Sequence, residues 1–154
     1  MRLVLFALGQ LFLGASASLA CPDYMQYGQE YSFTGQQVYQ PVGFPVVAGG
    51  DYRLSSCNIR FLSDRGDGYV TRAPDFTFGI SGLSGYELQF RVESDCDAIL
   101  VVNTGGANWY YDDDDAGNGD PAIRLTRPSE GIYDAWIGTY DGKSCQARLI
   151  VETF

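Results

Sequence analysis

The chain has 154 residues and carries 19 acidic against 10 basic side chains, a formal net charge of −9. A surface this acidic repels nucleic acid and anionic lipid, which argues against both as partners. The sequence contains no histidine, which excludes a Ser-His-Asp or Cys-His catalytic site, a His-ligated zinc and a histidine pH switch. The length is that of one ordinary domain with room for a real core.

The beginning of the chain has the pattern of a secretory signal peptide. A short basic start precedes an apolar run from Leu3 to Leu13, and small residues follow. We expect residues 1–20 to be a signal peptide that is removed before Cys21, and residues 21–154 to form one exported domain, periplasmic or extracellular. The run is too short and broken for a good membrane span. Lipid attachment to Cys21 is the alternative, but Ser18 stands where a lipobox carries an aliphatic residue.

Four cysteines follow the predicted signal peptide: Cys21, Cys57, Cys96 and Cys145. An even number in an exported protein predicts two disulfides, with three pairings open. We prefer Cys21–Cys57, which would hold a loose N-terminus, and Cys96–Cys145, which would join the end of one strand to the start of another.

The rest of the chain reads as β-structure. Residues 21–40 are rich in Gln and Tyr with little periodicity, so we expect an N-terminal strap there. Strands are predicted, in chain order, over residues 44–48, 52–55, 58–62, 69–71, 74–80, 86–93, 98–102, 132–140 and 146–153. Turn signals recur about every 8–12 residues, a spacing typical of a sandwich or barrel.

Two of these strands carry informative side-chain patterns. Residues 98–102 are apolar on both faces, which predicts a central strand. On strand 132–140, Trp136 and Tyr140 share a face with Asp134. Because a face with a carboxylate is usually exposed, Trp136, Tyr140 and the more distant Trp109 are candidate ligand-binding aromatic residues that could stack on sugar rings. The alternative is that they fill the core.

The segment from Trp109 to Ile123 contains the strongest chemical signal. Four consecutive aspartates, a Gly-Asn-Gly turn and a further aspartate place five carboxylates within nine residues. Like charges about 4 Å apart cost roughly 1 kcal/mol per pair in water, and a calcium ion with oxygen ligands removes that cost. The predicted ligands are Asp113, Asp114, Asp115, Asn118 and Asp120. The spacing is not that of an EF-hand, and a solvated acidic loop that blocks edge pairing is the alternative.

Two further acidic pairs stand in predicted turns. Asp95 and Asp97 flank Cys96, and Asp64 and Asp67 lie in a Gly-containing loop. Either pair could join the acidic loop in space or form a second site. Solvated turn carboxylates are the other interpretation.

From Asp75 to Val151 the chain resembles the bacterial pre-peptidase C-terminal domain. The resemblance rests on an order of pieces: Pro74-Asp-Phe-Thr-Phe, the alternating strand Tyr86–Asp97, Asp97-Ala-Ile-Leu-Val-Val, the aromatic-Asp-Asp loop ending in Pro-Ala-Ile, and Gly131-Ile-Tyr-Asp-Ala-Trp before a last strand. It implies an all-β fold, a single antiparallel jelly-roll-like β-sandwich, often calcium-binding. It also implies a non-catalytic role, because such domains accompany secreted peptidases, and we expect a small exported variant standing alone.

The sequence thus predicts a non-catalytic exported module with a structural Ca²⁺ ion in its acidic loop. A module that recognises a polysaccharide or a secreted or cell-surface protein through surface aromatics is the alternative. A hydrolase acting through paired aspartates is a remote one.

Overall fold

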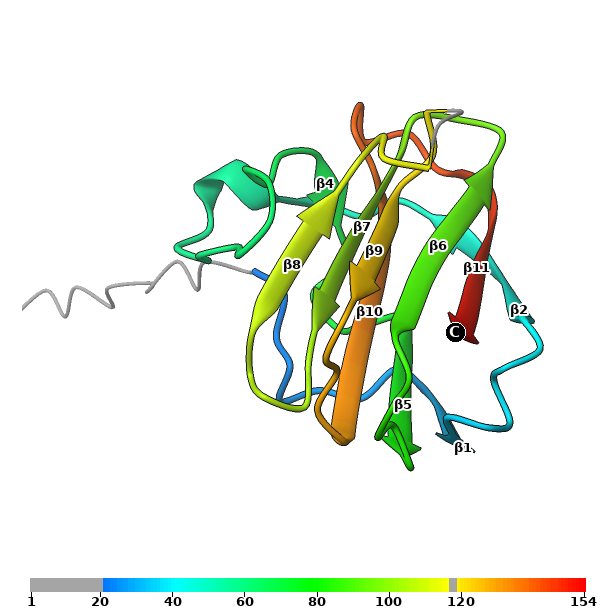
Figure 1. The fold of residues 1–154 in the computed structure, drawn as a ribbon. Coiled ribbons are helices and arrows are strands. Elements are labelled where there is room, and N and C mark those ends of the chain that lie inside the picture. The colour runs from blue at the N-terminus through cyan, green and yellow to red at the C-terminus, as the bar shows by residue number, and fades with distance from the viewer. Residues whose placement is uncertain (1–20, 117–118) are drawn as a thin grey trace, which may run out of the picture.

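The computed structural model describes residues 21–116 and 119–154. The predicted signal peptide and Asn118 lie outside the described residues. Two β-sheets pack face to face, so the predicted β-sandwich is confirmed (Figure 1). No helix among the described residues is long and apolar enough to span a membrane.

The larger sheet has seven strands. They are β1 (Gln29–Thr34), β5 (Phe76–Ser81), β10 (Gly131–Thr139), β4 (Tyr69–Val70), β3 (Tyr52–Arg53), β7 (Ala98–Asn103) and β8 (Trp109–Asp112). Strand β10 is the central strand of this sheet, because it pairs with β5 near its start and with β7 and β4 near its end. Among the strands of the described residues, β8 pairs with β7 alone and forms an edge.

The smaller sheet has four strands in the order β2 (Val42–Ala48), β11 (Cys145–Thr153), β6 (Leu88–Ser94) and β9 (Ala122–Leu125). All of its pairs are antiparallel. Strand β9 forms one edge, so β8 and β9 are edge strands of opposite sheets.

The main core fills the space between the two sheets. Leu88, Phe90 and Val92 alternate inward on β6, as the sequence pattern predicts. On β7, Ala98, Leu100 and Val102 belong to this core, whereas Ile99 and Val101 point to the other face of the larger sheet. The prediction of a central strand over 98–102 is therefore confirmed.

A second apolar cluster covers the outer face of the larger sheet. It consists of Leu54, Val70, Ile99, Val101, Tyr111 and Trp136, with Phe61 and Trp109 packed against it. The segment between β3 and β4, which begins with a 3-10 turn at Leu54–Ser56, supplies the cover. Buried apolar area on both faces explains why β7 lacks a polar side.

Two expectations about local structure are wrong. The segment 58–62 is no strand, and only Phe61 makes an isolated bridge, to Trp109. The strap 21–40 contains strand β1, which pairs with β5 in parallel, an exception to the antiparallel pattern. Tyr31 of β1 stacks on Phe78 of β5 and packs against Phe44, so aromatic packing holds this strand.

Both disulfides form in the preferred pairing. Cys21 is bonded to Cys57 and Cys96 to Cys145. Because the Sγ atom of Cys21 lies in a disulfide, it cannot also form the thioether of a lipoprotein. The second bridge joins the turn after β6 to the start of β11, at the end of the sandwich that also carries the acidic loop.

Candidate functional site

The acidic loop begins with Asp112, the last residue of β8. Its side chain is 3% exposed, and its Oδ2 atom accepts hydrogen bonds from the backbone N–H of Asp115 at 3.1 Å and of Ala122 at 2.6 Å. The backbone N–H of Ala116 donates to the Asp120 carbonyl at 2.9 Å. The chain therefore turns at Asp112, and the alternation expected of an extended stretch does not apply to the aspartates that follow.

Two overlapping groups of carboxylate oxygens result from this turn. Asp112, Asp113 and Asp114 each offer one oxygen, and these atoms lie within 4.8 Å of one another. The same holds for Asp64, Asp112 and Asp115. Two oxygens bound to one calcium ion at 2.3–2.6 Å are at most about 5 Å apart, so each group is compact enough to share one ion.

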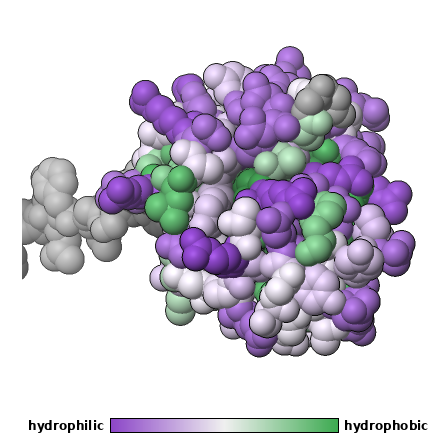
Figure 2. Space-filling view, in the orientation of Figure 1, coloured by the Kyte–Doolittle hydropathy of each residue, from purple (hydrophilic) through white to green (hydrophobic). Residues whose placement is uncertain are grey.

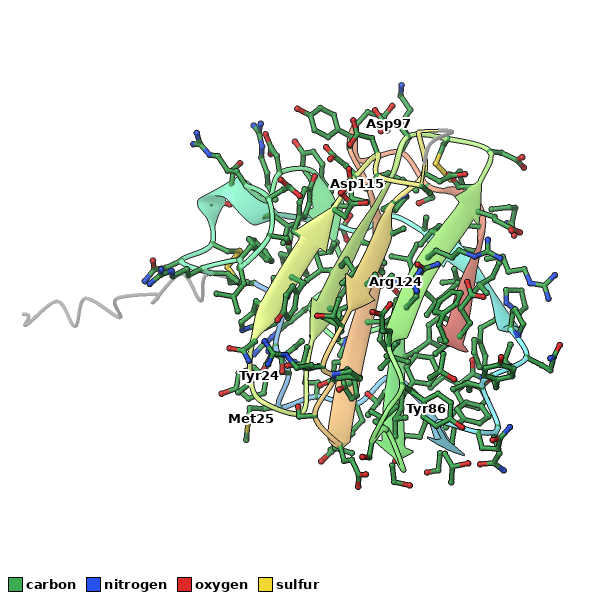
Figure 3. All side chains as sticks on the ribbon, in the orientation of Figure 1. Tyr24, Met25, Tyr86, Asp97, Asp115 and Arg124 are labelled. Carbon is green, nitrogen blue, oxygen red and sulfur yellow. A yellow bond between two sulfur atoms is a disulfide. The ribbon has the colours of Figure 1, made fainter. Side chains whose placement is uncertain are left out.

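Asp64 and Asp97 join the acidic loop, as the sequence allowed. Asp64 belongs to one of the two oxygen groups, and Asp97 is close enough for its charge to raise the pKa of Asp113. Asp97 and Asp115 lie at the same end of the sandwich (Figure 3). Three separate segments therefore contribute carboxylates to one region.

The other member of each acidic pair, Asp67 and Asp95, does not join the acidic loop. Asp67 pairs with Arg53 at 3.2 Å and accepts a hydrogen bond from the Gly68 N–H. Asp95 is exposed and belongs to neither group.

Asp120 lies at the end of the acidic loop, next to β9. It is buried, and its Oδ1 atom accepts a hydrogen bond from the Ser94 hydroxyl at 2.7 Å. It belongs to neither oxygen group of the described residues. Asp120 thus ties the end of the loop to β6.

The local electrostatics favour a cation. Burial is the main cause that raises the pKa of Asp112, partly opposed by the hydrogen bonds from Ala122 and Asp115. Burial also raises the pKa of Asp113, and the charges of Asp114, Asp97 and Asp64 add to it. None of the six ion pairs among the described residues involves these five aspartates. No lysine or arginine of the described residues is therefore paired with these carboxylates.

The predicted aromatic platform is not formed. Trp136 is fully buried in the second cluster, and its Nε1–H donates to the Arg72 carbonyl at 3.3 Å. The expectation that Trp136 is a surface residue is wrong. Its premise fails because Asp134 is also buried, where it accepts a 2.6 Å hydrogen bond from the Thr77 hydroxyl.

The other two candidate aromatics have different surroundings. Trp109 is partly buried, with its ring 5.2 Å from that of Trp136 and in edge contact with Tyr24. Tyr140 is 46% exposed. The three candidates thus form no common flat surface.

The sequence did not reveal the central role of Asp112 in the site. It placed Asp112 in the acidic run but not among the ligands, although Asp112 alone belongs to both oxygen groups. A signal was present, since an aspartate at the end of a strand before a turn typically accepts backbone N–H bonds.

No protein-family model matches the chain, and no curated protein sequence matches it. Among solved structures, the chain is similar to PliG of Aeromonas hydrophila, a periplasmic lysozyme inhibitor of g-type lysozyme, at 12% identity and a TM-score of 0.45. The similarity covers 82% of this chain and 99% of that chain.

Proposed function

We propose that this protein is an exported, non-catalytic β-sandwich module whose acidic loop holds a structural calcium ion. The single observation that carries the proposal is the convergence of Asp64, Asp97 and the run Asp112–Asp115, with no cationic side chain of the described residues paired to them. Oxygen-only ligands of this kind suit a hard dication.

The ligand set follows from the two oxygen groups. Asp112 is the shared member, with Asp113 and Asp114 on one side and Asp64 and Asp115 on the other. A calcium ion takes six to eight oxygens, so loop carbonyls and water would complete the shell. The resemblance of residues 75–151 to the pre-peptidase C-terminal domain supports the same proposal, because members of that family often bind calcium.

Two further observations support export and a non-catalytic role. The two disulfides fit an oxidising compartment. Five of the hollows among the described residues are each lined by at most one carboxylate, whereas a glycosidase needs two across one cleft. The remote hydrolase alternative therefore gains no support.

Thermal melts with and without calcium test the proposal. A ligand at a hundredfold excess over Kd adds about 2.7 kcal/mol, which raises the Tm of a domain of this size by roughly 10 °C. The double variant Asp113→Asn, Asp114→Asn should lose this rise. The matched control is Asp51→Asn with Asp95→Asn, which removes the same charge from exposed positions outside the two groups.

Calcium, magnesium and a chelator are compared at equal ionic strength, because non-specific screening of negative charge also stabilises an acidic protein. A wild-type Tm that is the same in millimolar calcium and in chelator would refute the proposal. An equal loss of the calcium effect in the control pair would refute the assignment of the site.

A further inference from the structure

A hollow, which we call the cleft, lies between the two edge strands at the end away from the acidic loop. Strands β8 and β9 belong to different sheets, and a hollow of about 260 Å³ opens beside them. Its walls are the turn 104–108 after β7, Tyr110 of β8 and the segment 124–129 at the end of β9. Arg124 marks this face in Figure 3, and the same face is largely hydrophilic in Figure 2.

The walls of this cleft are held in place without a ligand. In the turn, the Thr104 N–H donates to the Asn108 carbonyl at 2.9 Å, and the Asn108 N–H donates to the Thr104 hydroxyl at 3.3 Å. Ala107, at φ 56°, is the only non-glycine of the described residues with a positive φ. On the opposite wall, the Tyr133 hydroxyl donates to the Ser129 carbonyl. Backbone strain of this kind persists where surrounding contacts fix it, and it is concentrated at binding sites.

The charge of the cleft is opposite to that of the whole protein. No carboxylate of the described residues lines it, whereas Arg124 and Arg127 both do. Arg124 is paired with Glu87 at 2.6 Å and stacks on the ring of Phe154, with its guanidinium carbon 3.9 Å from the ring centroid. Arg127 is exposed and takes part in no ion pair among the described residues. Arg127 is therefore a cation available to an anionic ligand.

The remaining lining is suited to a polyhydroxylated ligand. Asn108, Thr126 and Ser129 supply amide and hydroxyl groups, and Tyr110 supplies a partly buried ring. Arg127 also lines a neighbouring hollow of about 440 Å³ that reaches Tyr86 and Glu87, and the Glu87 carboxylate is already paired with Arg124. The two hollows together have the size of a ligand site, and an extended chain could cross Arg127 from one to the other.

We propose that this cleft binds an acidic polysaccharide, with Arg127 pairing with a uronate carboxylate and Tyr110 lying against a sugar ring. The planar guanidinium matches a carboxylate with two parallel hydrogen bonds. Hydroxyl and amide side chains match sugar hydroxyls, and a tyrosine ring can cover the apolar face of a sugar. A purely acidic peptide would use the arginine but leave the hydroxyl-rich walls unmatched.

Calorimetric titration with tetragalacturonate tests this proposal. Chelator is present throughout, because uronates bind calcium and the acidic loop is proposed to bind it, and near-UV circular dichroism confirms that the protein is folded. Wild type should bind saturably. Arg127→Gln should weaken binding by about tenfold, as expected when a charge-assisted hydrogen bond is lost. Arg148→Gln, which removes an exposed arginine outside the cleft that takes part in no ion pair of the described chain, should change the affinity less than twofold.

Two further probes identify the ligand chemistry. The methyl ester of the same oligosaccharide keeps the rings and removes the charge, so it should bind about tenfold more weakly than the acid, as expected for the loss of a charge-assisted hydrogen bond. A hexaglutamate peptide should not bind. The proposal is overturned if no saturable binding is seen at millimolar tetragalacturonate, if Arg148→Gln weakens binding as much as Arg127→Gln, or if the peptide binds as well as the sugar.

Discussion

Asp75 stabilises the folded protein less at neutral pH than in acid, and replacing it with asparagine should reveal this. Asp75 directly precedes β5 and is tied on three sides. Its N–H donates to the Ala135 carbonyl, its carbonyl accepts from the Gln29 N–H, both at 2.9 Å, and its Oδ2 atom accepts from the Ile137 N–H at 2.7 Å. None of the six ion pairs among the described residues involves it.

The magnitude follows from the pKa of this carboxyl. Burial raises the pKa of Asp75 from 3.8 to about 6, against the lowering effect of the hydrogen bond from Ile137. The folded state thus holds the proton more tightly than the unfolded state. The resulting stability is fully present below about pH 4 and is lost as pH rises through 6, a change of about 3 kcal/mol for this rise in pKa.

An asparagine side chain at this position would be neutral at every pH, and its amide oxygen can still accept the Ile137 hydrogen bond. We therefore expect Asp75→Asn to match wild type near pH 4 and to exceed it by up to about 3 kcal/mol at pH 8. Asp95→Asn, at an exposed carboxylate, is the control and should show no such trend.

Urea unfolding of the three proteins between pH 4 and 8 measures this difference. Taking each variant minus wild type at the same pH cancels the titration of all other groups, including the acidic loop. A difference between Asp75→Asn and wild type that stays constant across this range would refute the reasoning. So would a variant less stable than wild type at pH 8.

Three further outcomes follow from the structure. Trp136→Ala should lower the free energy of unfolding by about 3–5 kcal/mol, whereas Tyr140→Ala should change it by less than about 0.5 kcal/mol; equal effects in urea unfolding would contradict the observed burial. Cys57→Ser should cost about 4 kcal/mol, because its disulfide spans 36 residues, and calorimetry showing an unchanged Tm would count against this. Asp64→Asn should weaken calcium binding in a titration about tenfold, whereas Asp67→Asn should not, and the reverse order would disprove the oxygen grouping.

The sandwich could be predicted because its signals are local. The first five residues of β7 are apolar on both faces, and β6 alternates without a break. These patterns depend on burial alone, so a sheet covered on one or both faces follows from composition and period. The disulfide pairing could be predicted from two local features, a loose N-terminus and the ends of two predicted strands.

Strand β1 could not be predicted because its signal is weak and its partner is distant. Only Tyr31 and Phe33 alternate with polar residues in its six positions. What makes it a strand is its parallel pairing with β5, more than forty residues later. Tertiary pairing of this kind decides strand formation when propensity does not.

The misplaced Trp136 has a similar cause. Nothing near it in sequence shows that the segment holding Leu54 and Phe61 covers the outer face of the larger sheet. The presence of Asp134 suggested exposure, but the Thr77 hydroxyl satisfies that carboxylate inside the protein. Buried acids that are satisfied by a hydrogen-bond donor are rare. The rule that a strand face with a carboxylate is exposed therefore predicted the wrong face for Trp136.

The acidic loop and the arginine-lined cleft lie at opposite ends of the same pair of edge strands. Strands β8 and β9 belong to different sheets, so no strand ladder fixes the distance between them. The bond from the Ala122 N–H to the Asp112 carboxylate, at 2.6 Å, joins the last residue of β8 to the first of β9. An ion bound among these aspartates would offset their mutual repulsion and keep Asp112 ionised as the acceptor of this bond, and would thereby maintain the spacing of the cleft walls. The two proposed sites would then share one structural element, and their affinities would be linked by the same coupling free energy in both directions.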